Sequence, residues 1–248
     1  MPLRIAFDLD GVLADMESEL LRQAELMFGE PSARSAQEGS DAAGGLSAAD
    51  AGDPAAGSTD ASPDFGPPAI RLNMTSRQQR RLWRHVESTE NFWEGLNEIE
   101  PGSIQRLAAM AIDRRWEVIF LTKRPDTAGA TAQVQTQRWL ESKGFMLPSV
   151  FVVQGSRGRI AAALALDIVV DDRPENCLDV VTDSKARAIL VWRDAEGQLP
   201  ATAQRLGIGV VKSVAECLGI LTKVESTARG DVLSRVMRLL GLKESTSM

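Results

Sequence analysis

The chain has 248 residues, 44% of them hydrophobic, which is enough for one large or two small domains with a buried core. It contains no apolar run of the about 18 or more residues that a membrane span needs, and its charged N-terminal segment does not resemble a signal peptide. We therefore expect a soluble, cytoplasmic protein without membrane attachment. The two cysteines, Cys177 and Cys217, form no metal-type pair and fit a reducing compartment.

The net charge of -6 comes from one part of the sequence, residues 29–68. This stretch holds seven acidic residues and one basic residue, so 34 - 7 = 27 acids and 28 - 1 = 27 bases remain elsewhere. It consists mostly of Ala, Gly, Ser, Asp and Pro, and it has too few large apolar side chains to offset the entropy lost on ordering. We predict a disordered insertion in a loop, with an acidic binding tail as the alternative.

Outside this stretch, short apolar runs alternate with helical patterns, which predicts an α/β fold with a parallel sheet covered by helices. The expected strands are residues 3–9, 117–121, 150–153, 168–171, 188–192 and 208–211. The expected helices are residues 13–28, 103–113, 129–143, 157–165, 174–183 and 213–221. Two further helical segments, 75–88 and 91–96, interrupt the alternation between the first and second strands.

The C-terminal segment from Asp231 places apolar residues at helical spacing and so predicts a helix with one apolar face. Its basic residues are few, which disfavours membrane attachment. We expect this face to dock onto the domain or onto a second copy of the chain in a homodimer.

The first predicted strand ends in two carboxylates, Asp8 and Asp10, followed by Gly11. On an extended backbone residues two apart point the same way, so both acids would face one crevice at the carboxyl end of the strand, where open α/β sheets bind ligands. Two acids on one face form an oxygen-rich site that suits Mg²⁺, and Gly11 lets the backbone approach a phosphate closely. A pair of helix-capping residues is the structural alternative.

A second acid pair, Asp171 and Asp172, follows another apolar run. Like charges at adjacent positions are costly unless a cation offsets them, so this pair also favours a metal site.

In their order and their places at strand ends, these segments resemble the motifs of the haloacid dehalogenase superfamily of aspartate-nucleophile phosphatases. The resemblance rests on the runs Asp8-Leu-Asp-Gly-Val-Leu13, Phe120-Leu-Thr-Lys-Arg-Pro125 and Asp171-Asp-Arg-Pro-Glu-Asn176. It implies a Rossmann-like three-layer sandwich with a small helical cap inserted after the first strand.

The same resemblance implies a role for each motif residue. Asp8 would be the nucleophile that forms an aspartyl-phosphate, and Asp10 the general acid and base. Thr122 and Lys123 would bind the phosphate, although Thr122 could equally cap a helix. Mg²⁺ would be held by Asp8, Asp10 and Asp171.

The third motif of the superfamily normally supplies a lysine that pairs with the nucleophile and the phosphate. Here Arg157 stands 171 - 157 = 14 residues before Asp171, at the spacing that the resemblance implies, and Arg159 is close enough to compete for the role. A guanidinium stays cationic and can hold phosphate through two N–H groups, but its planar fork differs from a compact ammonium group. This departure leaves open a protein that keeps the fold and binds ligands with weak turnover.

The resemblance also divides the chain. It implies a catalytic core of residues 1–14 and 97–222, a helical cap of residues 15–96 that contains the insertion 29–68, and a C-terminal helix and tail of residues 223–248.

Within the superfamily, segments 121–125, 135–140 and 171–176 are most similar to the 5'-nucleotidase and 5'(3')-deoxyribonucleotidase branch. This similarity implies a Mg²⁺-dependent phosphomonoesterase that acts on (deoxy)nucleoside monophosphates and not on a nucleic acid polymer. Phe92 and Trp93 would stack on the nucleoside, or they would form the core of the cap. Another small phosphate ester, such as a sugar phosphate, is the alternative substrate.

Overall fold

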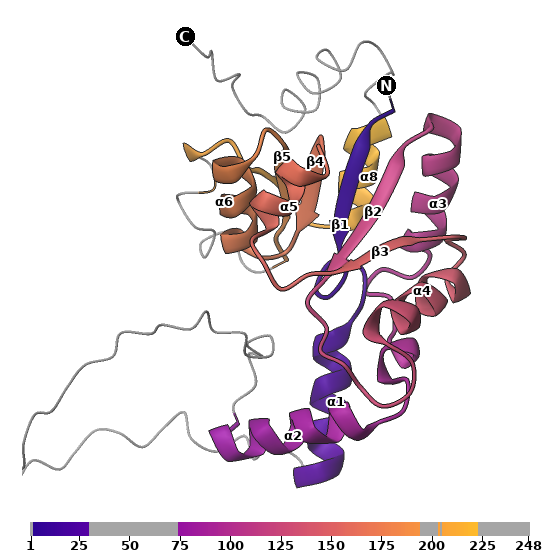
Figure 1. Ribbon diagram of the computed structural model, residues 1–248, viewed down its shortest axis with the longest axis vertical. Coiled ribbons are helices and arrows are strands. Elements are labelled where there is room, and N and C mark those ends of the chain that lie inside the picture. Colours follow the sequence, from indigo (N-terminus) through magenta and orange to yellow (C-terminus); the bar gives the residue numbers. More distant parts are fainter. Residues whose placement is uncertain (1, 30–73, 194–202, 204, 223–248) are drawn as a thin grey trace, which may run out of the picture.

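The computed structural model describes residues 2–29, 74–193, 203 and 205–222. Its centre is a sheet of parallel strands in the order β3-β2-β1-β4-β5-β6 (Figure 1). The strands are β1 (Arg4–Asp8), β2 (Glu117–Thr122), β3 (Ser149–Val152), β4 (Ile168–Asp171), β5 (Arg187–Val191) and β6 (Gly209–Val211). The predicted α/β class and parallel sheet are therefore confirmed.

The helices also lie where the sequence pattern predicts them, within a few residues. They are α1 (Met16–Phe28), α2 (Ser76–Ser88), the 3₁₀ helix η1 (Phe92–Gly95), α3 (Ser103–Arg114), α4 (Ala132–Ser142), α5 (Arg157–Ala163), α6 (Pro174–Asp183) and α8 (Val214–Thr222). The expected insertion beyond Gly29 and the expected C-terminal helix fall outside the described residues. None of the helices within the described ranges is long and apolar enough to cross a membrane.

Successive side chains of β1 point to opposite faces of the sheet and enter two different apolar clusters. Ile5 and Phe7 pack with buried residues of α3, α4 and α8. Ala6 packs with buried residues of α5 and α6 on the other face. The sheet is thus covered by helices on both sides, which makes the expected three-layer sandwich.

The strand order reverses direction at β1, because β2 and β3 lie on one side of it and β4, β5 and β6 on the other. Open α/β sheets bind their ligands outside the carboxyl ends of the strands at such a reversal. In Figure 1 the helices α1 and α2 lie together beyond the carboxyl end of β1. This end of the sheet is therefore where a site is expected, and it faces the α1–α2 pair.

The chain leaves the end of the sheet just before α1 and returns to it after η1. These two points of the chain lie next to each other. The Asp15 N–H donates to the carbonyl of Asn97 at 2.9 Å, and the Ile99 N–H donates to the carbonyl of Leu13 at 2.9 Å. The Asp15 side chain then accepts from the Ser18 N–H and so begins α1. The division of the chain into a core of residues 1–14 and 97–222 and a cap of residues 15–96 stays a prediction.

Candidate active site

The carboxyl ends of β1, β2 and β4 bring the motif residues together. In the register of the sheet Asp8 lies opposite Leu121, and Phe7 lies opposite Val170. Asp171, one residue after Val170, is therefore level with Asp8, and Thr122 lies one residue further along β2. All three side chains are buried, with relative exposures of 6% for Asp8 and 0% for Thr122 and Asp171.

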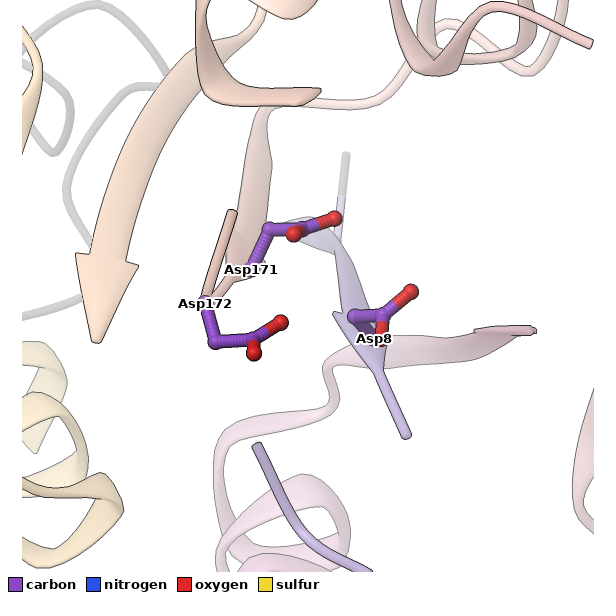
Figure 2. A group of neighbouring side chains, drawn as sticks. All are labelled: Asp8, Asp171 and Asp172. Carbon is purple, nitrogen blue, oxygen red and sulfur yellow. The ribbon is translucent and has the colours of Figure 1, made fainter. Parts of the chain in front are cut away.

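Three carboxylates form a group at this edge of the sheet: Asp8, Asp171 and Asp172. Each offers an oxygen within 4.8 Å of the oxygens offered by the other two. Figure 2 shows the Asp172 side chain next to that of Asp171 at the end of β4, with Asp8 across from them on β1. Asp10, which was expected to be a metal ligand, does not belong to this group. Asp172, which follows Asp171 directly in the chain, does.

The group fits a hard divalent cation. Its donors are carboxylate oxygens, which Mg²⁺ prefers. Within the described residues, the buried Asp172 Oδ1 has no hydrogen-bond donor, so it has capacity for a cation. Burial raises the pKa of Asp172 to about 7, with a further contribution from the Asp171 charge. Crowded carboxylates of this kind are stabilised in their ionised form by a nearby positive ion.

Asp171 is held in place by donors from the start of α6. The Asn176 side chain donates to both Asp171 oxygens at 3.0 Å, and the Arg173 N–H donates to Oδ1 at 2.9 Å. Burial raises the pKa of Asp171, and the Arg157 charge and these hydrogen bonds lower it. Asn176 thus fixes the orientation of a carboxylate that would otherwise rotate.

Arg157 lies beside the proposed nucleophile. Its Nη2 donates to Asp8 Oδ1, and its Nε lies 3.6 Å from Asp171 Oδ2. The side chain is 2% exposed, whereas Arg159 is exposed at the surface. Of the two arginines that the sequence left in competition, the fold therefore brings Arg157 to the carboxylates.

The guanidinium of Arg157 also keeps donor capacity. Its Nε and Nη1 are buried and have no hydrogen-bond acceptor within the described part of the chain. Burial raises the pKa of Asp8 well above its ordinary value, Asp171 raises it further, and Arg157 lowers it. Arg157 therefore favours the ionised, nucleophilic form of Asp8 and still has N–H groups with which to bind an anion.

Asp10 is bound by a second arginine, Arg124. The Arg124 Nε donates to Asp10 Oδ1 and Oδ2 at 2.9 and 3.1 Å, and its Nη2 donates to Oδ1 at 2.7 Å. The Thr122 hydroxyl donates to Asp10 Oδ2 at 2.8 Å, so this hydroxyl, expected to bind phosphate, contacts Asp10 in the structure. Sequence reasoning missed Arg124, since an arginine before a proline in a loop gives no signal of burial.

The formal charges of the site are nearly balanced. Four acids and two guanidinium groups give -4 + 2 = -2 when all are ionised, and they are Asp8, Asp10, Asp171, Asp172, Arg124 and Arg157. One divalent cation would cancel this remainder.

The two aromatic residues expected to stack on a substrate are buried. Trp93 is 0% exposed, and its indole N–H donates to the carbonyl of Pro125 at 3.0 Å. Phe92 is 6% exposed and meets Trp93 edge to face, with ring centroids 5.0 Å apart. This is the packing expected of a core. Lys123, the other expected phosphate ligand, is half-buried next to Thr122.

The comparisons with known proteins identify the fold. No protein family model matches the chain. No curated protein matches it either. Among solved structures, the chain is similar to the crystal structure of a putative β-phosphoglucomutase from Thermotoga maritima, with a TM-score of 0.52 and 17% sequence identity. The similarity covers 90% of this chain and 99% of that one. The architecture built around the carboxylates is therefore one that a solved structure shares over nearly its whole length.

Proposed function

We propose that the chain is a Mg²⁺-dependent phosphomonoesterase of the haloacid dehalogenase superfamily, with Asp8 as its nucleophile. The observation that carries the proposal is the environment of Asp8, a buried carboxylate at the reversal point of a parallel sheet that contacts Arg157 and is grouped with Asp171 and Asp172. The fold shared with a putative phosphoglucomutase supports the same class of chemistry. In this proposal residues 1–14 and 97–222 are the core and residues 15–96 the cap.

Asp8, Asp171 and Asp172 would hold the cation, and Asp10 would join the same shell only by leaving its contacts with Arg124 and Thr122. The bound cation would neutralise negative charge on the phosphate oxygens. Arg157 would bind another of these oxygens through the N–H groups that have no acceptor in the structure. Lys123 would add a positive charge at the entrance.

The reaction then has two halves. A carboxylate oxygen of Asp8 attacks phosphorus, the bond from phosphorus to the leaving oxygen breaks, and Asp10 gives its proton to that oxygen. In the second half Asp10 takes a proton from water, the water oxygen attacks phosphorus, and the bond between phosphorus and Asp8 breaks. Free phosphate leaves, and both aspartates return to their starting states.

For the substrate we propose (deoxy)nucleoside monophosphates, on the strength of the nucleotidase-like segments 121–125, 135–140 and 171–176. A sugar phosphate is the second candidate, favoured by the name of the structurally similar protein. The burial of Trp93 favours neither, because a ring engaged on all sides offers no face to a base.

A phosphate-release screen tests the proposal. Nucleoside 5'- and 3'-monophosphates and hexose phosphates are each incubated with the protein in Mg²⁺ and in EDTA, beside the variant Asp8→Asn. We expect turnover of at least one substrate in Mg²⁺, none in EDTA, and a hydroxylamine-sensitive phosphoenzyme in the wild type alone. The matched control is Asp113→Asn, an exposed aspartate on α3, which should behave as wild type. Full turnover by Asp8→Asn would show that the nucleophile is another group.

A further inference from the structure

Arg124 is a buried arginine two residues after the end of β2. It is 1% exposed, and arginine is rarely buried to this degree unless its charge is paired. Two of its nitrogens contact the Asp10 carboxylate, as described above, and the third, Nη1, donates to the Thr136 hydroxyl at 3.0 Å. All three guanidinium nitrogens are therefore engaged, and the strongest contact is with Asp10.

Two tryptophan rings hold the guanidinium in this orientation. The Arg124 Cζ lies 5.2 Å from the ring centroid of Trp93 and 5.6 Å from that of Trp139. Contacts of this kind are stronger when they are desolvated, as they are here. Each ring is itself fixed by its N–H group, since Trp93 donates to Pro125 and Trp139 donates to the carbonyl of Leu96 at 2.7 Å.

The Arg124 side chain is held more firmly than the arginine of an exposed ion pair. An exposed pair gains little, because two long side chains must be ordered to form it. Here the ordering is already imposed by Trp93, Trp139 and Thr136, and the planar fork presents its N–H groups to the Asp10 carboxylate at a fixed angle. The position of Asp10 is thus set by residues outside the group of Asp8, Asp171 and Asp172.

We propose that Arg124 is a positioning residue that sets the Asp10 carboxylate in place for proton transfer to the leaving group, with Trp93 and Trp139 as its supports. The inference rests on the proposed function, in which Asp10 is the acid and base. It also links the site to the α1–α2 pair, because Trp93 belongs to η1, which is the element that follows α2 in the chain. A shift of α2 and η1 would reach Asp10 through Trp93 and Arg124.

The test uses leaving groups that differ in their need for a proton. A nucleoside or sugar phosphate releases an alkoxide that must be protonated, whereas p-nitrophenyl phosphate releases a stable phenolate. The constant kcat/KM reports the transfer of phosphate to the enzyme for both. A misplacement of about 1 Å costs roughly 10²-fold in rate. We therefore expect Arg124→Lys, which keeps the charge and loses the fork, to lower kcat/KM by about 10–100-fold for the best alkyl substrate of the screen and much less for p-nitrophenyl phosphate.

Three comparisons separate positioning from mere loss of structure. Asp10→Asn should show the same dependence on the leaving group, and adding Arg124→Lys to it should change the ratio between the two substrates no further. Trp93→Phe, which keeps a ring but loses the bond to Pro125, should shift the ratio in the same direction by a smaller amount. Arg106→Lys is the matched control, because Arg106 is an exposed arginine on α3.

The outcomes are distinguishable. If wild-type protein hydrolyses neither kind of substrate, the proposed function and this inference fall together. If Asp10→Asn discriminates between leaving groups but Arg124→Lys lowers kcat/KM equally for both, or for neither, the proposed function stands and the positioning role is refuted. If Arg124→Lys fails to fold, the ratio of kcat/KM between the two substrates is measured for Trp93→Phe instead. An unchanged ratio in that variant refutes the positioning role.

Discussion

Gly11 is the position where a single methyl group should damage the carboxylate group most directly. Its φ of +90° is rarely adopted by residues with a side chain, and a Cβ built there would lie 2.1 Å from Asp172 Oδ2. Real Cβ atoms essentially never come closer than 3.0 Å to such an atom, so the oxygen would have to move by at least 3.0 - 2.1 = 0.9 Å. Mg²⁺ binds oxygen at about 2.0–2.1 Å in near-ideal octahedral geometry, and a ligand displaced this far is lost.

We therefore expect Gly11→Ala to weaken Mg²⁺ binding by about 10–100-fold, the range seen when the surroundings of a metal ligand are disturbed. The backbone conformation adds a loss of about 1–3 kcal/mol in the free energy of unfolding. Titration calorimetry with MgCl₂ measures the first effect, and urea unfolding without Mg²⁺ measures the second. Gly219→Ala is the control, because apart from its chain neighbours and the backbone of its own helix no described atom lies within 4 Å of its Cβ position, and it should leave Mg²⁺ binding unchanged.

A second background isolates the clash from the backbone strain. In Asp172→Ala the carboxylate is absent, so adding Gly11→Ala should cost unfolding free energy but no further Mg²⁺ affinity. Wild-type affinity for Mg²⁺ in Gly11→Ala would refute the reasoning, since it would mean that Asp172 is not a ligand or that the loop moves away freely.

Three further predictions follow from the same contacts. Asp10→Asn should lower kcat by about 10²–10⁴-fold on the best substrate, measured as steady-state phosphate release, and a loss below tenfold would argue against proton transfer by Asp10. Gly158→Ala should lower the free energy of unfolding by about 1–3 kcal/mol in urea, because its Cβ would lie 2.1 Å from the carbonyl oxygen of Asp179 where α5 crosses α6; an unchanged midpoint would contradict that packing. Without Mg²⁺, the free energy of unfolding should fall as the pH rises from about 4 to about 7, because the folded protein keeps a proton on Asp172, whose pKa is raised from 3.8 to about 7, while the unfolded chain has released it. Burial raises the pKa of Asp8 and of Asp171 as well, so Asp172→Asn should make this dependence shallower without abolishing it in urea unfolding curves collected across that pH range, and a variant that keeps the full slope would assign it to those two groups.

The sequence predicted the secondary structure well because each element carries its own signal. The apolar run of β4, Ile168–Asp171, is bounded by polar residues on both sides, and α6 begins with a proline at its first turn. The order of the strands carries no such local signal. The lengths of the crossovers allow several arrangements, and the choice is made by how whole helices pack on the two faces.

The candidate site was predicted in outline and not in detail. Asp8 and Asp171 follow from the rule that parallel strands present their carboxyl ends at one edge. Asp10 departs from the expectation because β1 ends at Asp8, so the alternation of an extended strand no longer governs a residue two positions further on. The turn there is closed by Leu9, whose carbonyl accepts from the N–H groups of Leu13 and Ala14 at 2.8 Å.

Arg124 could not have been found without coordinates. Its partners come from three separate segments, the turn after β1, η1 and α4, and no spacing in the sequence relates Asp10 to Trp93, Thr136 or Trp139. A buried cation of this kind is specified by the shape of its surroundings, which exists only once the chain has folded.

The chain leaves the sheet at Leu13–Asp15 and returns at Asn97–Ile99, and these two segments are hydrogen-bonded to each other. This has a consequence for how the protein can evolve. A segment whose two ends are already adjacent closes a loop whatever its length, and the entropy of closure grows only with the logarithm of that length. Lengthening, shortening or exchanging this segment should therefore change the free energy of unfolding of the sheet and its helices only slightly. Selection can reshape this segment while the carboxylates at the edge of the sheet stay where the strands put them.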